Sequence, residues 1–366
     1  MIERKQYLPD DNMPAIQQPW IETPLIESAQ LSKLAGCRIF LKLENLQPSS
    51  SFKSRGIGNL MLQSIREQAQ DSSDSRPLHF FSSSGGNAGL ACVTAATRLG
   101  YKASVVVPTS TDDRTIEKLR AAGATEVLSH GDSWFYADQY LREVVIPTAE
   151  QRGEKGIYIH PFDHPAIWDG AATMVDEIKT QMPDSEIPDA IVCSVGGGGL
   201  FSGIVKGIDR AGSNWADHVR VLPVETLGAD SLAQSVHKGE LVTLPGITSI
   251  ATSLGAIRVS EHAFREAQRP TVTPVVVEDA EAVSACWRFL DDERFLVEPA
   301  CGASVAMAYD GRLKHYLGSN FHPDTKVVII VCGGSKISLD LLNKYRQTYQ
   351  RRSDELALEY SPKDAE

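Results

Sequence analysis

The chain has 366 residues, of which 42% are hydrophobic and 23% are charged. This length exceeds what one hydrophobic core usually serves, so we expect two domains. The formal net charge of −11 argues against nucleic acid as the main ligand, because phosphate backbones are bound by basic patches. We find no apolar run of bilayer length and no apolar secretory segment at the N-terminus, so we expect no membrane contact and a cytoplasmic protein.

Short apolar stretches rich in β-branched residues alternate with longer amphipathic stretches. The strands predicted by this pattern are 38–44, 78–84, 102–108, 125–131, 156–162, 190–196, 219–225 and 326–334. The stretches between them, such as "NAGLACVTAATRLG" (87–100), carry apolar residues at helical spacing and end in glycine. The alternation predicts an α/β fold with mostly parallel sheets covered by helices, whose ligands bind beyond the carboxyl ends of the strands.

The cysteine and histidine patterns favour reduced thiols and no metal centre. Six cysteines are present, none in a CxxC pair, and several lie in apolar runs such as "LACVTAA", so we expect buried free thiols. The nine histidines show no spacing typical of a metal site.

Three glycine-rich loops follow predicted strands. The first, "SSSGGNAG" (82–89), offers hydroxyls, an amide and bare backbone before a helix, which suits a carboxylate, although a turn with a helix N-cap explains it equally well. The second, "SVGGGGLFSG" (194–203), exposes four consecutive glycine N–H groups before a helix, which suits a phosphate. The third, "VVIIVCGGSK" (327–336), ends a buried strand at Cys332, whose thiol could hydrogen-bond a neutral ring nitrogen or simply be packed.

The second loop also leaves a nicotinamide dehydrogenase open. It is no Walker loop, and the GxGxxG spacing fails because position 202 is serine. The next predicted strand nevertheless ends in Glu225, where a dinucleotide enzyme would bind its ribose.

The stretch "PSSSFKSRG" (48–56) places Lys53 directly after Phe52 and among serines. Pyridoxal phosphate (PLP) needs an amine for a Schiff base, an anion cradle and a partner for its ring nitrogen. Lys53 and the three loops together provide these features.

The ordered motifs resemble one family. They are "PSSSFKSRGIGNL", "SSSGGNAGLA", "HPFDHPAIWDG", "CSVGGGGLFSGIVKG", "VETLGADS", "LPGITSIATSLGA", "VEPACGAS" and "VIIVCGGSKISL". Together they resemble the fungal and animal L-serine/L-threonine dehydratases, which are PLP enzymes of fold type II. The similarity runs in order from about Thr23 to about residue 340, nearly the whole chain.

This resemblance implies a role for each site residue. Lys53 carries the cofactor as a Schiff base and, once freed, removes the α-proton of the substrate. Further cofactor contacts are implied for Phe52, Asn87, Gly196, Gly197, Gly198, Gly199, Leu200, Ser253 and Cys332. Substrate-carboxylate contacts are implied for Ser84, Gly85, Gly86 and Asn87. A monovalent cation such as K⁺ is implied to contact Glu225, Ala229, Ser231, Leu254 and Ala256.

The resemblance also implies the architecture and the reaction. We expect a small domain at 47–158, a large PLP-binding domain at 1–46 plus 159–366, the cofactor in the cleft between them, and a homodimer. The expected reaction is β-elimination from L-serine, L-threonine or a related β-hydroxy amino acid, which gives a 2-oxo acid and ammonia. A β-replacing synthase, a racemase and a PLP-binding member without turnover remain as alternatives.

Four departures from the family pattern leave the substrate open. Ser50 stands where relatives usually have glycine, and Gly170-Ala171-Ala172-Thr173 stands where many have Gly-His-Ser/Thr-Ser. Lys336 replaces a common asparagine and adds a positive charge. Gly85 stands where relatives carry alanine or glycine, and it is expected to widen the pocket.

Overall fold

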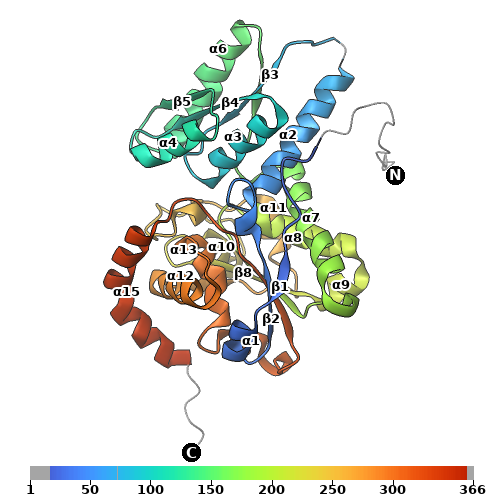
Figure 1. Cartoon of the computed structure of the whole chain (residues 1–366), viewed down its shortest axis with the longest axis vertical. Coiled ribbons are helices and arrows are strands. Elements are labelled where there is room, and N and C mark those ends of the chain that lie inside the picture. Colours follow the sequence, from blue (N-terminus) through green and yellow to red (C-terminus); the bar gives the residue numbers. More distant parts are fainter. Residues whose placement is uncertain (1–16, 72, 361–366) are drawn as a thin grey trace, which may run out of the picture.

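The computed structural model describes residues 17–71 and 73–360. The N-terminal stretch 1–16, on which the expectation about a secretory signal rests, lies outside the described residues. Two lobes are visible, each built around one sheet, with helices α2 and α7 where the lobes meet (Figure 1). Within the described ranges, no helix has both the length and the apolar character needed to cross a bilayer.

The larger sheet has six strands in the order β1-β2-β10-β7-β8-β9. Its strands are β1 (Leu25–Glu27), β2 (Arg38–Lys42), β7 (Ala190–Ser194), β8 (Arg220–Thr226), β9 (Val275–Val277) and β10 (Lys326–Ile330). The smaller sheet has the order β5-β4-β3-β6. Its strands are β3 (Leu78–Ser82), β4 (Lys102–Val107), β5 (Glu126–Ser129) and β6 (Lys155–Tyr158). Every pair of neighbouring strands is parallel except β1 and β2, which are antiparallel.

The α/β prediction is confirmed, and all eight predicted strands occur. Most of them end earlier than predicted, because the predicted strands included glycine-rich residues that leave the sheet as loops. Strand β10, for example, stops at Ile330, four residues before the predicted end at Gly334. Strands β1 and β9 were not predicted. Each has only three residues, too few for an alternating pattern to be recognised.

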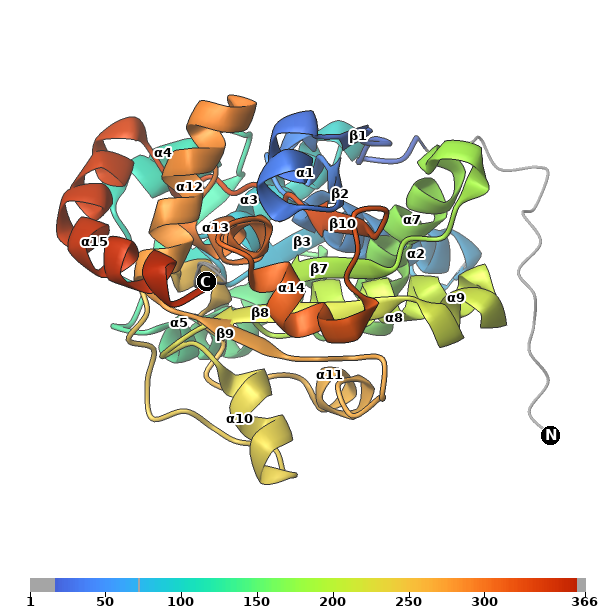
Figure 2. The ribbon, with the colours of Figure 1, turned by 90° about the horizontal axis from the view of Figure 1, so that it is seen from below.

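Helices connect the strands and cover the sheets. They are α1 (Ala29–Ala35), α2 (Lys53–Gln70), α3 (Asn87–Leu99), α4 (Asp113–Ala121), α5 (Trp134–Tyr140), α6 (Ile146–Gln151), α7 (Pro165–Gln181), α8 (Gly199–Ala211), α9 (Ser213–His218), α10 (Ser231–Lys238), α11 (Glu261–Glu266), α12 (Asp279–Glu293), α13 (Pro299–Val305), α14 (Arg312–Leu317) and α15 (Leu339–Tyr360). Figure 2 shows strands β10, β7 and β8 surrounded by helices. Helix α7 packs on both α8 and α2, so it joins the two lobes.

The apolar core is divided in the same way as the sheets. One large buried cluster surrounds the six-stranded sheet, and two smaller clusters surround the four-stranded sheet. All six cysteines are free and buried, as expected from their apolar surroundings. The strands within residues 78–158 thus form one sheet, and the strands before and after this range in the sequence form the other. This arrangement supports the division at 47–158, which stays a prediction in its boundaries.

Candidate active site

The predicted site residues come from loops at the carboxyl ends of β3, β7 and β10 and from the start of α2. These segments meet where the lobes join. Lys53 of α2 and Gly199 of the second loop line one small cavity. Asn87, after β3, reaches the large lobe: its side chain accepts a hydrogen bond from the Ser335 N–H after β10 and lies 3.4 Å from the Ser253 hydroxyl.

Lys53 is the first residue of α2. Its Nζ donates a hydrogen bond to the carbonyl oxygen of Pro161 at 2.7 Å and lies 5.3 Å from the centre of the Phe52 ring. Burial lowers the pKa of Lys53 to about 8, against a smaller opposing effect of the Cys332 and Glu298 charges. More of this amine is therefore neutral at neutral pH than in an exposed lysine, which makes it a usable nucleophile and base.

The residues that follow Lys53 anchor the start of α2. Arg55 is fully buried and binds the Glu44 carboxylate through two nitrogens, at 2.7 and 2.8 Å. Its third nitrogen binds Glu177 of α7 at 2.5 Å. A side chain at Gly56 would collide with Ile167, with a Cβ 2.7 Å from its methyl carbon. The sequence "KSRG" thus fixes the lysine against the large lobe.

Thr173, in the departure from the family pattern at 170–173, belongs to this anchor. Its hydroxyl accepts a hydrogen bond from Arg55 at 3.1 Å and donates one to the carbonyl oxygen of Gly170 at 2.6 Å. Ala171 lies against Gly203 of α8, where a Cβ would be 2.4 Å from the Ala171 methyl. The small side chains therefore allow α7 and α8 to pack closely.

Side-chain hydrogen bonds fix the shape of the first loop (82–89). The Ser84 hydroxyl accepts a hydrogen bond from the Gly86 N–H at 3.2 Å. The hydroxyls of Ser83 and Tyr158 both donate to the buried Asp138 carboxylate at 2.6 Å. At Gly85 a Cβ would lie 3.1 Å from a methyl of Val107. A side chain at Gly85 would therefore press on Val107, and the expected widening of the pocket stays a prediction.

Glu298 is a site residue that the sequence analysis missed. It is 4% exposed, accepts a hydrogen bond from the Asn87 amide at 2.7 Å, and accepts another from the Lys336 N–H at 3.3 Å. Burial raises the pKa of Glu298. The Asn87 oxygen accepts from the Ser335 N–H at 2.9 Å, so both ends of this amide are held by the large lobe. Glu298 therefore orients Asn87 across the cleft.

The four glycines of the second loop are packed tightly. A Cβ at Gly197 would lie 2.4 Å from the Phe162 ring, and one at Gly199 would lie 2.7 Å from the Phe162 carbonyl oxygen. Gly198 has φ +95° and would place a Cβ 2.4 Å from Ala263. These N–H groups precede the 13-residue helix α8, and the Ser202 hydroxyl in its first turn is buried with no hydrogen-bond partner in the described part of the chain. The arrangement offers a helix N-terminus and bare backbone to an anion.

Cys332 lies two residues after the end of β10, in a pair of buried thiols. Its Sγ donates to the Ile330 carbonyl oxygen at 3.6 Å. A hydrogen bond from Cys301 lowers the pKa of Cys332, and burial raises the pKa of Cys301. Cys301 lies in the motif "VEPACGAS", which does not indicate a contact with Cys332, so only the fold shows it as the partner.

The residues predicted for a cation fall in two groups. Glu225 is fully buried at the end of β8, and its carboxylate accepts hydrogen bonds from the N–H groups of Leu232 and Ala233 at 2.9 and 2.7 Å. Ala229 lies in the turn after β8, and Ser231 is the first residue of α10. The buried Ser231 hydroxyl has no hydrogen-bond partner among the residues described. Leu254 and Ala256 lie on another segment, which packs against the second loop. A Cβ added to Gly196 would lie 3.1 Å from the Leu254 Cα. Burial raises the pKa of Glu225 to about 8.

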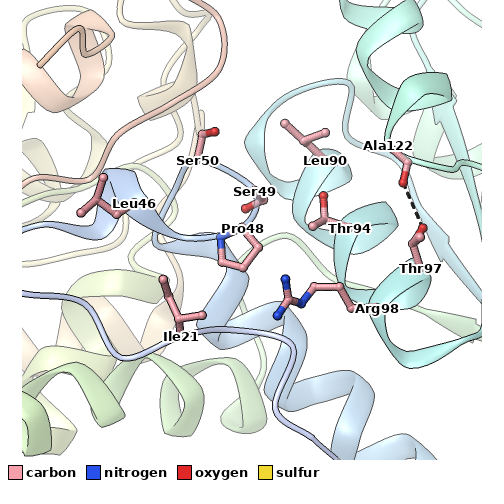
Figure 3. Close-up of a pocket in the computed structure, with 10 residues that line it drawn as sticks. All are labelled: Ile21, Leu46, Pro48, Ser49, Ser50, Leu90, Thr94, Thr97, Arg98 and Ala122. Atoms are coloured by element: carbon pink, nitrogen blue, oxygen red, sulfur yellow. Dashed lines mark hydrogen bonds between the residues drawn. The ribbon is translucent and has the colours of Figure 1, made fainter.

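A groove of about 480 Å³ separates the lobes beside Ser50 (Figure 3). The segment 48–50 lines one side, and Leu90, Thr94 and Arg98 of α3 line the other. Ser50 has φ +59°, in the left-handed region that favours glycine, and its carbonyl oxygen accepts from the Gly334 N–H at 2.8 Å. The family glycine at this position thus has a conformational reason.

The substitution Ser50→Gly is expected to raise the free energy of unfolding by about 0.5–1 kcal/mol. The left-handed conformation costs a non-glycine residue about 1–2 kcal/mol, which the higher chain entropy of glycine partly offsets. Urea unfolding of both proteins would measure the difference. Ser51→Gly is the control, because Ser51 is buried without a positive φ and its replacement should destabilise. Equal destabilisation by both changes would contradict the prediction.

The comparisons with known proteins agree with this geometry. The sequence profile of the family "Pyridoxal-phosphate dependent enzyme" matches residues 16–333. The chain is 43% identical over 332 residues to an L-serine dehydratase of Saccharomyces cerevisiae, covering 89% of this chain and 97% of the relative. It is also 43% identical over 327 residues to the human protein "Serine dehydratase-like", covering 88% and 93%.

A solved structure shares the fold. The fungal L-serine ammonia-lyase from Rhizomucor miehei superimposes with a TM-score of 0.81 at 37% identity, covering 91% of this chain and all of that one. These similarities cover both lobes, so the matched residues include the whole candidate site. The chain belongs to the L-serine/L-threonine dehydratase family of pyridoxal-phosphate-dependent enzymes, which have fold type II.

Proposed function

We propose that this protein is a PLP-dependent lyase that eliminates the β-hydroxyl group of L-serine, L-threonine or a related β-hydroxy amino acid, releasing a 2-oxo acid and ammonia. The observation that carries this proposal is the Lys53 amine, whose pKa burial lowers to about 8 and which lines one cavity with Gly199 of the second loop. Family membership leaves the nicotinamide alternative without support.

The side chains fit the cofactor. The Lys53 amine has no carboxylate within ion-pair distance among the described residues, the glycine loop precedes α8, and a thiol ends β10. The Lys53 amine would hold the aldehyde, the N–H groups of 196–200 the phosphate, and Cys332 the ring nitrogen. When bound, the cofactor withdraws electrons from the substrate α-carbon. Phe52, beside Lys53, and Ser253, beside Asn87, would contact its ring.

The chain's own groups then perform binding and proton transfer. The loop from Ser84 to Asn87 binds the substrate carboxylate and thereby orients the α-hydrogen. The Lys53 Nζ, when its amine is free, would accept the α-proton of the bound amino acid. Cys332 is a thiol and not a carboxylate, so it would give the ring nitrogen a neutral partner, and the β-hydroxyl group would leave as water after gaining one proton.

Ammonia release from a panel of β-hydroxy amino acids tests this proposal. We expect L-serine or L-threonine to yield equal amounts of ammonia and 2-oxo acid. Borohydride reduction of the loaded protein, followed by peptide mapping, should label Lys53. A labelled lysine without ammonia from any amino acid would instead identify a PLP-binding member without turnover. Appearance of the D-isomer would favour a racemase, and capture of an added thiol would favour a synthase.

We also propose a monovalent cation beside Glu225. The support is a fully buried carboxylate with no cationic partner in the described chain, next to the unpartnered Ser231 hydroxyl. A buried charge of this kind is normally compensated. A bound K⁺ would stabilise the ionised form.

The expected result is that K⁺ raises the melting temperature more at pH 8 than at pH 6. Without a cation, the folded protein keeps a proton on Glu225 up to about pH 8, whereas the unfolded chain loses it near its ordinary pKa of 4.5. Stability therefore falls as pH rises through this window, and K⁺ removes that loss by replacing the proton. Thermal unfolding in KCl and in tetramethylammonium chloride measures the effect. Glu225→Gln should abolish the difference, and equal melting temperatures of the parent in both salts would refute the site.

The homodimer and the cytoplasmic location stay predictions, as does the expectation that neither nucleic acid nor a membrane is a partner. The net charge of −11 supports the expectation about nucleic acid. Size-exclusion chromatography with light scattering would test the dimer.

A further inference from the structure

The loop after β10 brings a lysine to the carboxylate-binding loop of the opposite lobe. Gly333 and Gly334 have φ values of +79° and +123°, so the chain turns sharply after Cys332. The Ser335 N–H then donates to the Asn87 oxygen at 2.9 Å, and the Lys336 N–H donates to Glu298 at 3.3 Å. The backbone at Ser335 and Lys336 is thus held by two residues of the site.

The side chain of Lys336 lies over Gly86. A Cβ placed on Gly86 would be 3.1 Å from Lys336 Cε, 3.4 Å from its Nζ and 3.7 Å from the Ser84 hydroxyl oxygen. The ammonium and the hydroxyl therefore flank the same point on the loop. Gly86 permits this approach, because any side chain there would push the lysine away.

The ammonium of Lys336 has no partner in the described chain: no hydrogen bond, and no carboxylate within 4.0 Å, involves its Nζ. The charge of Lys336 acts to lower the pKa of the Asp112 and Glu298 carboxyl groups, but neither group forms an ion pair with its Nζ. Glu298 already accepts from Asn87, and Asp112 accepts from the Thr115 N–H as the N-cap of α4. The nearby Lys118 ammonium donates to the Ser335 carbonyl oxygen. A single positive charge is thus left facing the loop.

We propose that Lys336 is a substrate-binding residue whose ammonium pairs with the α-carboxylate held by residues 84–87. The inference rests on the proposed function and deepens it. The loop itself offers only neutral donors and the partial charge of the α3 N-terminus. A full cation adds a charge-assisted hydrogen bond, which is roughly twice as strong as a neutral one. The enzyme therefore gains a preference for free amino acids over their uncharged derivatives.

The first test compares steady-state kinetics of the PLP-loaded parent and Lys336→Met. We expect the KM for L-serine to rise roughly 10- to 150-fold, the equivalent of losing one charge-assisted bond. The kcat should change less than about 2-fold, because the contact is the same in the ground state and the transition state. Lys336→Arg should recover most of the affinity. Lys33→Met, on α1 in the large lobe, is the matched control and should leave KM unchanged.

A second measurement separates charge recognition from a structural effect and from the reaction itself. Calorimetry of the loaded protein compares 3-hydroxypropanoate with neutral 3-hydroxypropanamide. We expect Lys336→Met to weaken binding of the acid several-fold and to leave the amide unchanged. Equal binding of the acid by both proteins, or equal loss for acid and amide, would overturn the proposal. This readout needs no turnover, so it fails or holds independently of the lyase activity.

Discussion

Replacing Lys53 with alanine is expected to lower kcat for L-serine by at least about 10³-fold. The amine serves as both the covalent anchor and the base, and positioned proton transfer alone contributes about 10²–10⁴-fold. The backbone around it is held by the Arg55 contacts, so the change should remove the chemistry and leave the fold in place. Ammonia release gives the rate, and far-ultraviolet circular dichroism checks the fold.

Lys53→Arg is the informative companion to this change. It keeps a positive charge beside the Phe52 ring and the Pro161 carbonyl oxygen, but it cannot form a Schiff base. If the charge alone mattered, the arginine variant would retain activity. We expect it to be as inactive as the alanine variant, and turnover of L-serine at the parent rate by either variant would rule out the proposed mechanism.

The local features of the site could be predicted from the sequence. Four adjacent glycines and a lysine after an aromatic residue carry information within a few positions, and the structure places Lys53 and Gly199 on one cavity. The departure at Ser50 is also a local feature, since a glycine in relatives suggests a positive φ, and Ser50 has a φ of +59°.

The long-range partners could not be predicted. Glu298 binds an amide 211 positions away, and nothing in "VEPACGAS" indicates that its carboxylate reaches Asn87. Lys336 was recognised as an added charge, but its position over Gly86 depends on how the two lobes meet. The same holds for Cys301, because two thiols in separate apolar segments give no sign of contact. Such pairs follow from tertiary packing, which residue spacing in one sequence does not encode.

A cluster of buried charged side chains lies next to the start of α2, and substitutions in it have the largest expected effect on the free energy of unfolding. Arg55 and Glu44 are both fully buried, and Lys42 of β2, also fully buried, binds Glu177 at 2.6 Å. Two cations and two carboxylates thus neutralise one another between α2, β2 and α7. Removing one member leaves the excess charge without a partner in a low-dielectric interior.

Arg55→Met is therefore expected to lower the free energy of unfolding by about 3–5 kcal/mol. The double change Arg55→Met with Glu44→Gln should cost less than Arg55→Met alone, because it also removes the stranded carboxylate. Arg351→Met is the surface control, since its pair with Glu355 is exposed and worth at most about 1 kcal/mol. Urea unfolding followed by tryptophan fluorescence measures all three. Arg55 lies two residues from Lys53, so the destabilised variant should also bind PLP covalently more slowly. A loss below about 1 kcal/mol, or a double variant less stable than the single one, would show that the cluster does not hold α2 against the large lobe.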